Sequence, residues 1–376
     1  MKKIKVMTIL GTRPEIIRLS EIIKRMEKYT RHVLVHTNQN FDYELNDIFF
    51  KELKLKEPDY ILDVKSKTIG EQIGKILIQT EKILIKEKPE AVLVLGDTNS
   101  ALSCIIAKRL KIPIFHMEAG NRCFDDRVPE EINRRIVDHT SDINLSYTEH
   151  ARRNLLMEGI RPENIFVTGS PLTEVLEKNK EKITKSPIME GLNLKENEFF
   201  LVSIHREENV DNKSNLTNII HALKNIAVEY QYPIVVSMHP RLRKRLEELN
   251  LELNNLIKLH TPFGFFDYVK LQKNAFCNLS DSGTIHEDAA IMGIPALVIR
   301  ESSERPEVYD TGNVILTGLN SNVILNSIEL VVKQKKRGIE FLCPQDYKDK
   351  NVSEKVMRLI VGMSKIIVKK KYYLTV

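Results

Sequence analysis

The chain has 376 residues, of which 42% are hydrophobic and 29% are charged, so it can fill large cores and is not a disordered chain. At roughly 100–200 residues per domain, this length predicts two domains or at most three. The net charge of +6 is mild for this length. We therefore expect no nucleic-acid partner, and an anionic small molecule suits the charge balance equally well.

Cysteine spacing and hydropathy indicate the compartment. The four cysteines form no C-x-x-C pair, which argues against a zinc knuckle or a disulfide framework and favours a reducing compartment. No apolar run approaches the ~20 residues that span a bilayer, and the basic start MKKIKVMTIL leads into GTRPE instead of a cleavage site. We therefore expect a soluble, cytoplasmic protein without a membrane partner.

Short apolar runs alternate with longer helical stretches through the first half of the chain. Nearly continuous apolar runs are typical of strands that are buried on both faces, as in a parallel sheet flanked by helices. The candidate strands are residues 6–10, 32–37, 91–96, 112–116, 143–146 and 165–168.

The same pattern restarts after Pro171. The candidate strands of the second half are residues 199–204, 234–238, 257–260, 276–279, 296–299 and 314–316. Two similar halves predict two doubly wound α/β domains that face each other. Ligands of such sheets bind outside the carboxyl ends of the strands, so we expect the site between the domains.

The first candidate strand runs into Gly11-Thr12-Arg13-Pro14-Glu15, with Arg18 shortly after. Glycine permits a tight turn and proline suits the first turn of a helix, so this segment predicts a helix start. A helix N-terminus with two arginines attracts an anionic group. The alternative for Glu15 is a capping box with Thr12, which leaves Arg13 unexplained.

Three carboxylates follow strands at the same predicted edge of the first sheet. Asp97 follows one strand, Glu118 follows the next, and a short loop then leads to Glu130 at a helix start. Crowded carboxylates acquire different pKa values and can divide acid and base roles. The structural alternative is that Asp97 caps the helix at Thr98 and that Glu130 complements a helix dipole.

In the second half, His205 follows a strand beside Arg206, and histidine titrates near neutrality. A strand, a small-residue turn at 280–283 and a helix start at Thr284 form a second candidate anion site, for which a Thr284-x-x-Glu287 capping box is the alternative. Arg305 follows another strand and is a candidate diphosphate clamp. GxGxxG, P-loop and HExxH patterns are absent, so a dinucleotide cofactor, a P-loop NTPase and a zincin are not expected.

Seven segments in family order resemble the non-hydrolysing UDP-N-acetylglucosamine 2-epimerases. They are GTRPE at 11–15, GDT at 96–98, HMEAG at 116–120, PEEINRR at 129–135, HREEN at 205–209, SDSGTIHED at 280–288 and ERPE at 304–307. Each segment alone is weak, but together they cover both halves of the chain.

This resemblance implies a GT-B-like α/β fold with two Rossmann-like domains and the active site in the cleft between them. It implies an N-terminal domain with the catalytic carboxylates (1–171), a UDP-binding domain (172–352) and a C-terminal helical segment that packs back on the first domain (353–376). Members invert C2 of UDP-GlcNAc to give UDP-ManNAc, by anti elimination of UDP to 2-acetamidoglucal and re-addition, for surface polysaccharide synthesis. They need no metal or other cofactor and are typically homodimers.

The resemblance also assigns roles to single residues. The acid/base carboxylates match Asp97, Glu118 and Glu130. The residues that bind UDP or stabilise its leaving charge match His205, Arg13, Arg18, Ser282, Gly283, Thr284 and Arg305. The family's nucleotide-binding acid falls on Asp288, the shorter member of a Glu-Asp pair. The division of acid and base roles among the three carboxylates stays open.

Three departures leave the exact sugar open. The loop 119–128 is short, the segment TPFGFFDY at 261–268 lacks the usual glutamine, and 38–42 does not match the residues through which many members bind an activating UDP-GlcNAc. The first and third of these features, with GTRPEIIRLS at 11–20, look like a subgroup that converts a UDP-6-deoxy-L-talosamine-type sugar to UDP-N-acetyl-L-fucosamine. A GT-B glycosyltransferase would share the fold and a nucleotide site, but three carboxylates at one edge argue against it.

Overall fold

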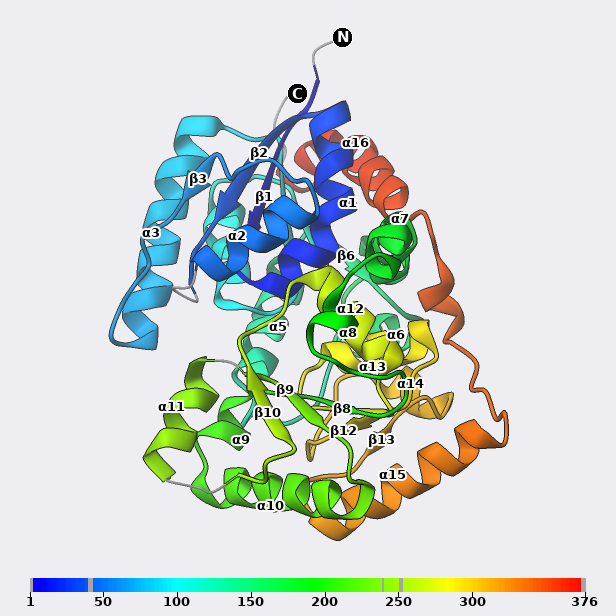
Figure 1. Cartoon of the computed structure of the whole chain (residues 1–376). Helices are drawn as coiled ribbons and strands as arrows, with labels where there is room; N and C mark the ends of the chain where they lie inside the picture. Colours follow the sequence, from blue (N-terminus) through cyan, green and yellow to red (C-terminus); the bar gives the residue numbers. More distant parts are fainter. Residues whose placement is uncertain (1–2, 40–42, 239, 250–252, 373–376) are drawn as a thin grey trace. The chain divides into compact units, whose positions relative to one another are not determined.

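The computed structural model describes residues 3–39, 43–238, 240–249 and 253–372. Residues 40–42, which belong to the segment 38–42 that differs from the family pattern, lie outside this described part. The chain divides into two compact units (Figure 1). The first unit comprises Met1–Lys178 and Gln345–Val376, and the second unit comprises Asn179–Pro344.

The first unit is built on a seven-stranded parallel sheet with strand order β3-β2-β1-β4-β5-β6-β7. Its strands are β1 (Lys5–Leu10), β2 (Arg31–His36), β3 (Tyr60–Ile61), β4 (Ala91–Leu95), β5 (Ile114–Met117), β6 (Ile143–Ser146) and β7 (Ile165–Val167). The six predicted strands are confirmed to within two residues. The sequence pattern missed β3, because two residues are too few to show a period.

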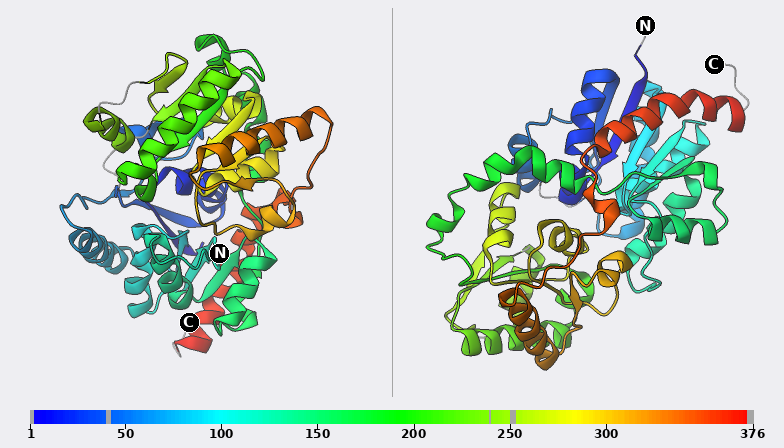
Figure 2. Two further views of the ribbon diagram at one scale, coloured as in Figure 1. Left: turned by 90° about the horizontal axis from the view of Figure 1, so that it is seen from below. Right: turned by 90° about the vertical axis from the view of Figure 1, so that its right-hand side faces the viewer.

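Helices cover both faces of this sheet. The helices are α1 (Arg13–Tyr29), α2 (Tyr43–Glu52), α3 (Ile69–Glu87), α4 (Cys104–Arg109), α5 (Pro129–Thr140), α6 (Glu149–Met157), α7 (Leu172–Thr184), which continues into the second unit, and α16 (Val352–Lys371). Apolar side chains of α3, α4 and α5 share one core with Met7 and Ile9 of β1. On the other side, α1 and α16 pack together, as Figures 1 and 2 show.

Buried polar contacts fasten α16 to the first unit. At its start, Glu174 accepts hydrogen bonds from the backbone N–H and the hydroxyl of Ser353, at 2.8 and 2.6 Å. At its end, the fully buried Asp142 accepts from Tyr372 Oη at 2.7 Å and forms an ion pair with Lys371. The last helix of the chain therefore completes the unit that the first strand begins.

The second unit is built on a six-stranded parallel sheet with strand order β10-β9-β8-β11-β12-β13. Its strands are β8 (Phe200–Ile204), β9 (Ile234–Met238), β10 (Ile257–His260), β11 (Cys277–Ser280), β12 (Ala296–Val298) and β13 (Ile315–Leu316). All six predicted strands are confirmed to within a residue at either end. Its remaining helices are α8 (Ile188–Gly191), α9 (Glu207–Val210), α10 (Lys213–Tyr230), α11 (Pro240–Leu249), α12 (Phe265–Asn274), α13 (Thr284–Met292), α14 (Pro306–Asp310) and α15 (Ser321–Lys336).

Side chains along β8 and the residue before it point alternately to the two faces of the sheet, and each face has its own hydrophobic core. Phe200 and Val202 pack with side chains of α10 and α15, which lie side by side in Figure 2. Phe199 and Leu201 pack on the opposite face with side chains of α8 and α12. Each unit is therefore a doubly wound α/β sheet, as the sequence predicts. In the part of the chain that the structure describes, no helix is long and apolar enough to cross a membrane.

Candidate active site

The site in the first unit is centred on Asp97, which follows β4 through a turn at Gly96. The Asp97 carboxylate accepts two hydrogen bonds from Arg134 of α5, from Nη2 at 2.5 Å and from Nε at 3.0 Å. A 3-10 turn follows instead of an α-helix, and its N-cap Thr98 makes no side-chain cap. The carboxylate therefore holds a guanidinium, and the capping interpretation of Asp97 is wrong.

Arg134 also reaches a second carboxylate, that of the fully buried Glu131, with Nη1 2.9 Å from Oε2. Glu131 accepts hydrogen bonds from the backbone N–H groups of Cys123 and Phe124, at 3.0 and 3.3 Å. Burial alone would raise the pKa of Glu131, but the backbone N–H of Cys123 and the charge of Arg134 lower it below its usual value. Arg134 thus joins α5 to the β4 edge. Glu131 and Arg134 both lie within the PEEINRR segment, in which the sequence motif assigns a role to Glu130 alone.

Glu118 lies at the same edge of the sheet. Strands β4 and β5 pair in parallel with Leu95 opposite Met117, so Glu118 follows β5 directly opposite Gly96. Glu118 is half-buried and has a left-handed backbone with φ of 64°, a conformation that residues other than glycine rarely adopt. Its Oε1 lies 3.5 Å from Asn121 Nδ2.

Glu130 is half-buried in the first turn of α5. This position also suits the predicted interaction with the helix dipole, because a negative charge is favourable at a helix N-terminus. Arg134, one turn later, holds Asp97. The structure therefore brings the β4 end, the β5 end and the start of α5 together, and each carries one of the three predicted carboxylates.

The turn before α1 is attached to the same edge by Glu15. Its Oε2 accepts from Gly11 N at 3.1 Å and from the Thr12 hydroxyl at 2.7 Å, and its Oε1 lies 3.3 Å from the Thr98 hydroxyl. Thr12 is the N-cap of α1 but makes no side-chain cap, so the capping box is only half formed. Burial raises the pKa of Glu15 to about 7.

The two predicted arginines of this segment differ in exposure. Arg13 is the first residue of α1 and is half-buried, whereas Arg18 is 4% exposed. Both belong to the helix whose start Glu15 ties to the loop after β4.

In the second unit, His205 follows β8 and the small-residue turn follows the neighbouring β11. His205 Nδ1 lies 3.2 Å from the fully buried carboxylate of Asp281. Gly283 is the N-cap of α13, so Thr284 is the first helical residue and the capping box predicted there is wrong. The Ser282 and Thr284 hydroxyls lie 3.0 Å apart.

The remaining predicted residues of the second unit already have protein partners. Arg305 is 2% exposed, and its Nη2 lies 3.4 Å from the fully buried Glu287. Asp288 accepts from Gln272 Nε2 at 2.8 Å. A Cβ at Gly283 would approach Glu304 Oε1 to 2.4 Å, so the turn is packed against the loop that leads to Arg305. Asp281 and Glu304 are two polar residues of this region to which the sequence motifs assign no role.

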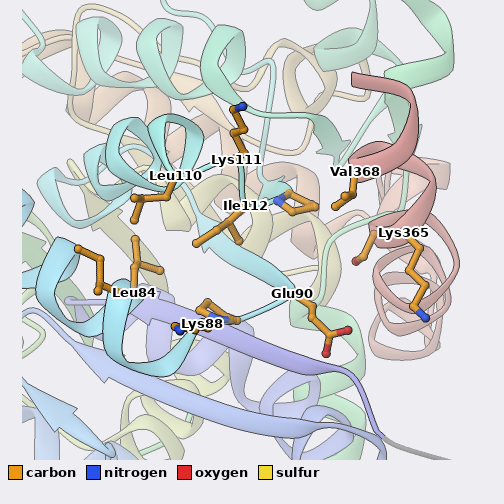
Figure 3. A pocket seen from close by; sticks show the side chains of 12 residues that line it. Leu84, Lys88, Glu90, Leu110, Lys111, Ile112, Lys365 and Val368 are labelled. Atoms are coloured by element: carbon orange, nitrogen blue, oxygen red, sulfur yellow. The ribbon is translucent and has the colours of Figure 1, made fainter. Parts of the chain in front are cut away.

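A separate groove of about 470 Å³ lies on the first unit (Figure 3). Its wall includes Leu84, Ile112 and Val368, near the amino-terminal ends of β4 and β5, and none of the predicted site residues. The predicted residues follow the opposite, carboxyl ends of the strands, where doubly wound sheets bind ligands. Among the described residues, no group of three histidine, cysteine, aspartate or glutamate side chains has the arrangement of a metal site.

Comparison with known proteins finds a matching family model, UDP-N-acetylglucosamine 2-epimerase, over residues 24–361. The structure of UDP-N-acetylglucosamine 2-epimerase from Rickettsia bellii is 45% identical, with a TM-score of 0.92 over 99% of this chain and 100% of that one. A Methanocaldococcus jannaschii UDP-GlcNAc 2-epimerase, solved in complex with UDP-GlcNAc and UDP, is 40% identical, with a TM-score of 0.90 over 96% of this chain and 100% of that one.

A relative with a different named substrate is also similar. The UDP-2,3-diacetamido-2,3-dideoxy-D-glucuronate 2-epimerase of Pseudomonas aeruginosa is 36% identical over 86% of this chain and 91% of its own length. At the level of fold alone, the calicheamicin glycosyltransferase CalG4 matches with a TM-score of 0.52 at 10% identity, over 99% of this chain and 100% of that one. The chain thus has the GT-B-like fold that the sequence predicts.

Proposed function

The chain belongs to the UDP-N-acetylglucosamine 2-epimerase family of isomerases, and from this premise we propose that it interconverts UDP-GlcNAc and UDP-ManNAc. The observation that carries the proposal is the position of Asp97, Glu118 and Glu130 at one edge of the first sheet, where Arg134 joins two of their three segments. Inversion at a carbon that bears hydrogen needs such groups, because a proton must leave one face and return to the other.

The proposed reaction has two steps. A carboxylate removes the proton from C2, the C1–O bond to UDP breaks, and a C1=C2 double bond forms in 2-acetamidoglucal. A carboxylic acid then delivers a proton to the other face of C2, and an oxygen of the UDP diphosphate forms a bond to C1 again. Asp97, Glu118 and Glu130 share the acid and base roles, which crowded carboxylates can divide.

The departing UDP takes up negative charge, which cations and N–H groups stabilise. We assign this task to His205, and the binding of UDP to Arg13, Arg18, Ser282, Gly283, Thr284, Asp288 and Arg305. The predicted division into a carboxylate domain (1–171), a UDP domain (172–352) and a helical segment (353–376), with the active site between the domains, is part of the same proposal.

Asp97→Asn tests the assignment of the carboxylates. Loss of a general acid or base lowers kcat by about 10²–10⁴-fold, while UDP binding should persist because it depends on other residues. Asp63→Asn, an exposed aspartate on the loop after β3, is the matched control and should keep wild-type activity. Near-normal turnover of Asp97→Asn would remove Asp97 from the catalytic set.

Reaction in D₂O tests the mechanism. The C2 proton passes to a carboxylate that exchanges with solvent, so the product should carry deuterium at C2. Product that retains only protium at C2 would exclude this route and would point to internal return or to an oxidation and reduction at the sugar.

The exact sugar is tested by competition. A UDP-6-deoxy-L-talosamine-type sugar is the second candidate, favoured by the short loop 119–128, and the Pseudomonas relative shows that family members with other named substrates exist. A sugar pocket built to bind one hydroxyl can reject an analogue that lacks it by several orders of magnitude. Strong preference for the L-sugar, with no UDP-ManNAc formed from UDP-GlcNAc, would overturn the first choice and keep the C2 epimerase chemistry.

We also propose a cytoplasmic homodimer. None of the four cysteines, which all lie in the described part of the chain, forms a disulfide, which suits a reducing compartment.

The dimer contact that we propose is on helix α3. This helix exposes Ile78 and Ile85, which are seven residues apart and therefore on one face, and 56% and 54% of these residues are accessible. Light scattering should give twice the chain mass, and Ile78→Lys with Ile85→Lys should give a monomer. A monomeric wild type would contradict the dimer.

A further inference from the structure

Asp281 is a buried acidic residue of the second unit to which neither the motif match nor the proposed mechanism gives a role. It directly follows β11, and its side chain is fully buried. Its carboxylate accepts hydrogen bonds from His205 N at 3.0 Å, from Arg206 N at 3.0 Å and from Asn209 Nδ2 at 3.1 Å. All three donors belong to the segment that follows β8.

The same carboxylate faces the ring of His205. Asp281 Oδ1 lies 3.2 Å from His205 Nδ1, within ion-pair distance, and 38% of the histidine side chain is exposed. Strands β8 and β11 are parallel neighbours with Ser203 opposite Ser280, so both residues emerge at the same end of the sheet. A buried carboxylate therefore lies behind a partly exposed imidazole.

The partners of Asp281 favour its ionised form. Burial alone would raise its pKa, but His205 and the donors from Arg206 and Asn209 lower it below the usual value. A carboxylate accepts hydrogen bonds and cannot donate them, so the ring nitrogen that faces it must carry the proton. Nδ1 of His205 is then the donor, and Nε2 is the nitrogen on the far side of the ring.

We propose that Asp281 is a positioning residue that acts through His205: it fixes the ring orientation and the Nδ1–H tautomer and stabilises the imidazolium that interacts with the departing diphosphate. This inference rests on the proposed function, which places His205 at the leaving UDP. A carboxylate that holds a histidine in this way works without touching the substrate, because it selects the tautomer and balances the positive ring.

A purely structural role is the competing explanation, since Asp281 also holds the backbone N–H groups of the 205–206 segment. The two explanations differ in what remains when His205 is absent. A positioning residue has nothing left to position, whereas a structural residue still maintains the loop and its neighbours. A double-mutant cycle measures this difference directly.

The experiment compares Asp281→Asn, His205→Asn and the double variant with the wild-type enzyme. We expect Asp281→Asn to lower kcat by about 10²–10⁴-fold with a KM within about threefold of wild type, because asparagine can accept the backbone hydrogen bonds but cannot balance an imidazolium. The double variant should be no slower than His205→Asn. Multiplied losses, or a KM that rises as much as kcat falls, would overturn the inference.

A second measurement needs neither turnover nor a folded Asp281 variant. Histidine labelled with ¹⁵N reports the tautomer of each ring, and the signal of His205 among the ten histidines is the one missing from His205→Asn. At a pH where the ring is neutral, we expect the Nδ1–H form. An Nε2–H signal would overturn the proposal. Failure to epimerise UDP-GlcNAc, with the Nδ1–H signal present, would count against the proposed substrate alone.

Discussion

Glu15 makes the stability of the protein depend on pH in an unusual direction. The carboxyl group is buried between the turn after β1 and the turn after β4, and burial raises its pKa from 4.5 to about 7. The folded chain then binds this proton more tightly than the unfolded chain does. The stabilisation is fully present below pH 4.5 and is lost as the pH rises through about 7.

The size of the effect follows from the two pKa values. A rise from 4.5 to about 7 corresponds to about 3 kcal/mol, most of which is lost between pH 5 and pH 8. Glu15→Gln should remove this loss. An uncharged amide resembles the protonated acid, because its oxygen can accept from Gly11 N. The Thr98 hydroxyl, which donates to the ionised carboxylate, can rotate and accept from the NH₂ group as it would from the acid proton.

Calorimetry at pH 5 and pH 8 measures the difference. For a domain of the size of the first unit, 1 kcal/mol shifts Tm by about 2–4 °C. From pH 5 to pH 8, the wild-type Tm should therefore fall by about 5–10 °C more than the Tm of Glu15→Gln. Comparing the two proteins cancels the other titrating groups. Equal shifts in the two proteins, or a larger shift in the variant, would refute the assignment of a raised pKa to Glu15.

Three further predictions concern the first unit. Arg134→Lys keeps a positive charge but loses the planar guanidinium that donates two hydrogen bonds to Asp97. The kcat should therefore fall by about 10²-fold with unchanged secondary structure. Activity within twofold of wild type would contradict this prediction. Gly120→Ala should lower the free energy of unfolding in urea by about 3 kcal/mol or more, because its Cβ would lie 2.3 Å from a backbone oxygen. The control Gly159→Ala has a similar positive φ but open space around its Cβ, and it should cost about 1 kcal/mol. Equal costs would show that backbone strain alone is responsible. Glu174→Ala leaves two donors at the start of α16 without their acceptor and should cost about 2–3 kcal/mol, with faster hydrogen exchange in α16; unchanged exchange there would contradict this role.

The strands of both sheets could be predicted because the information is local. Runs of apolar residues such as 91–96 and 234–238 must be buried on both faces, and this property depends on consecutive side chains alone. The exception, Tyr60–Ile61, is too short to show any period and is a strand only because β2 lies beside it.

The capping interpretations failed because they are also local, whereas the partners of these side chains are distant in sequence. Thr284-x-x-Glu287 has the pattern of a capping box, but Glu287 pairs with Arg305, and Gly283 occupies the cap position. Asp97 meets Arg134 across 37 residues. Motif spacing shows that a polar residue lies at a strand end, and only the packed sheet shows which charge it meets there.

The position of α16 has a consequence for how the protein is made. The second unit is inserted between Lys178 and Gln345 of the first, so the ribosome completes it before the last helix of the first unit exists. Tyr372, the hydrogen-bond partner of Asp142, lies 230 residues later in the chain. At about 5–20 residues per second, its synthesis follows that of Asp142 by roughly 10–50 s. During that time the apolar side of α1 that α16 covers stays open to chaperones and to other nascent chains.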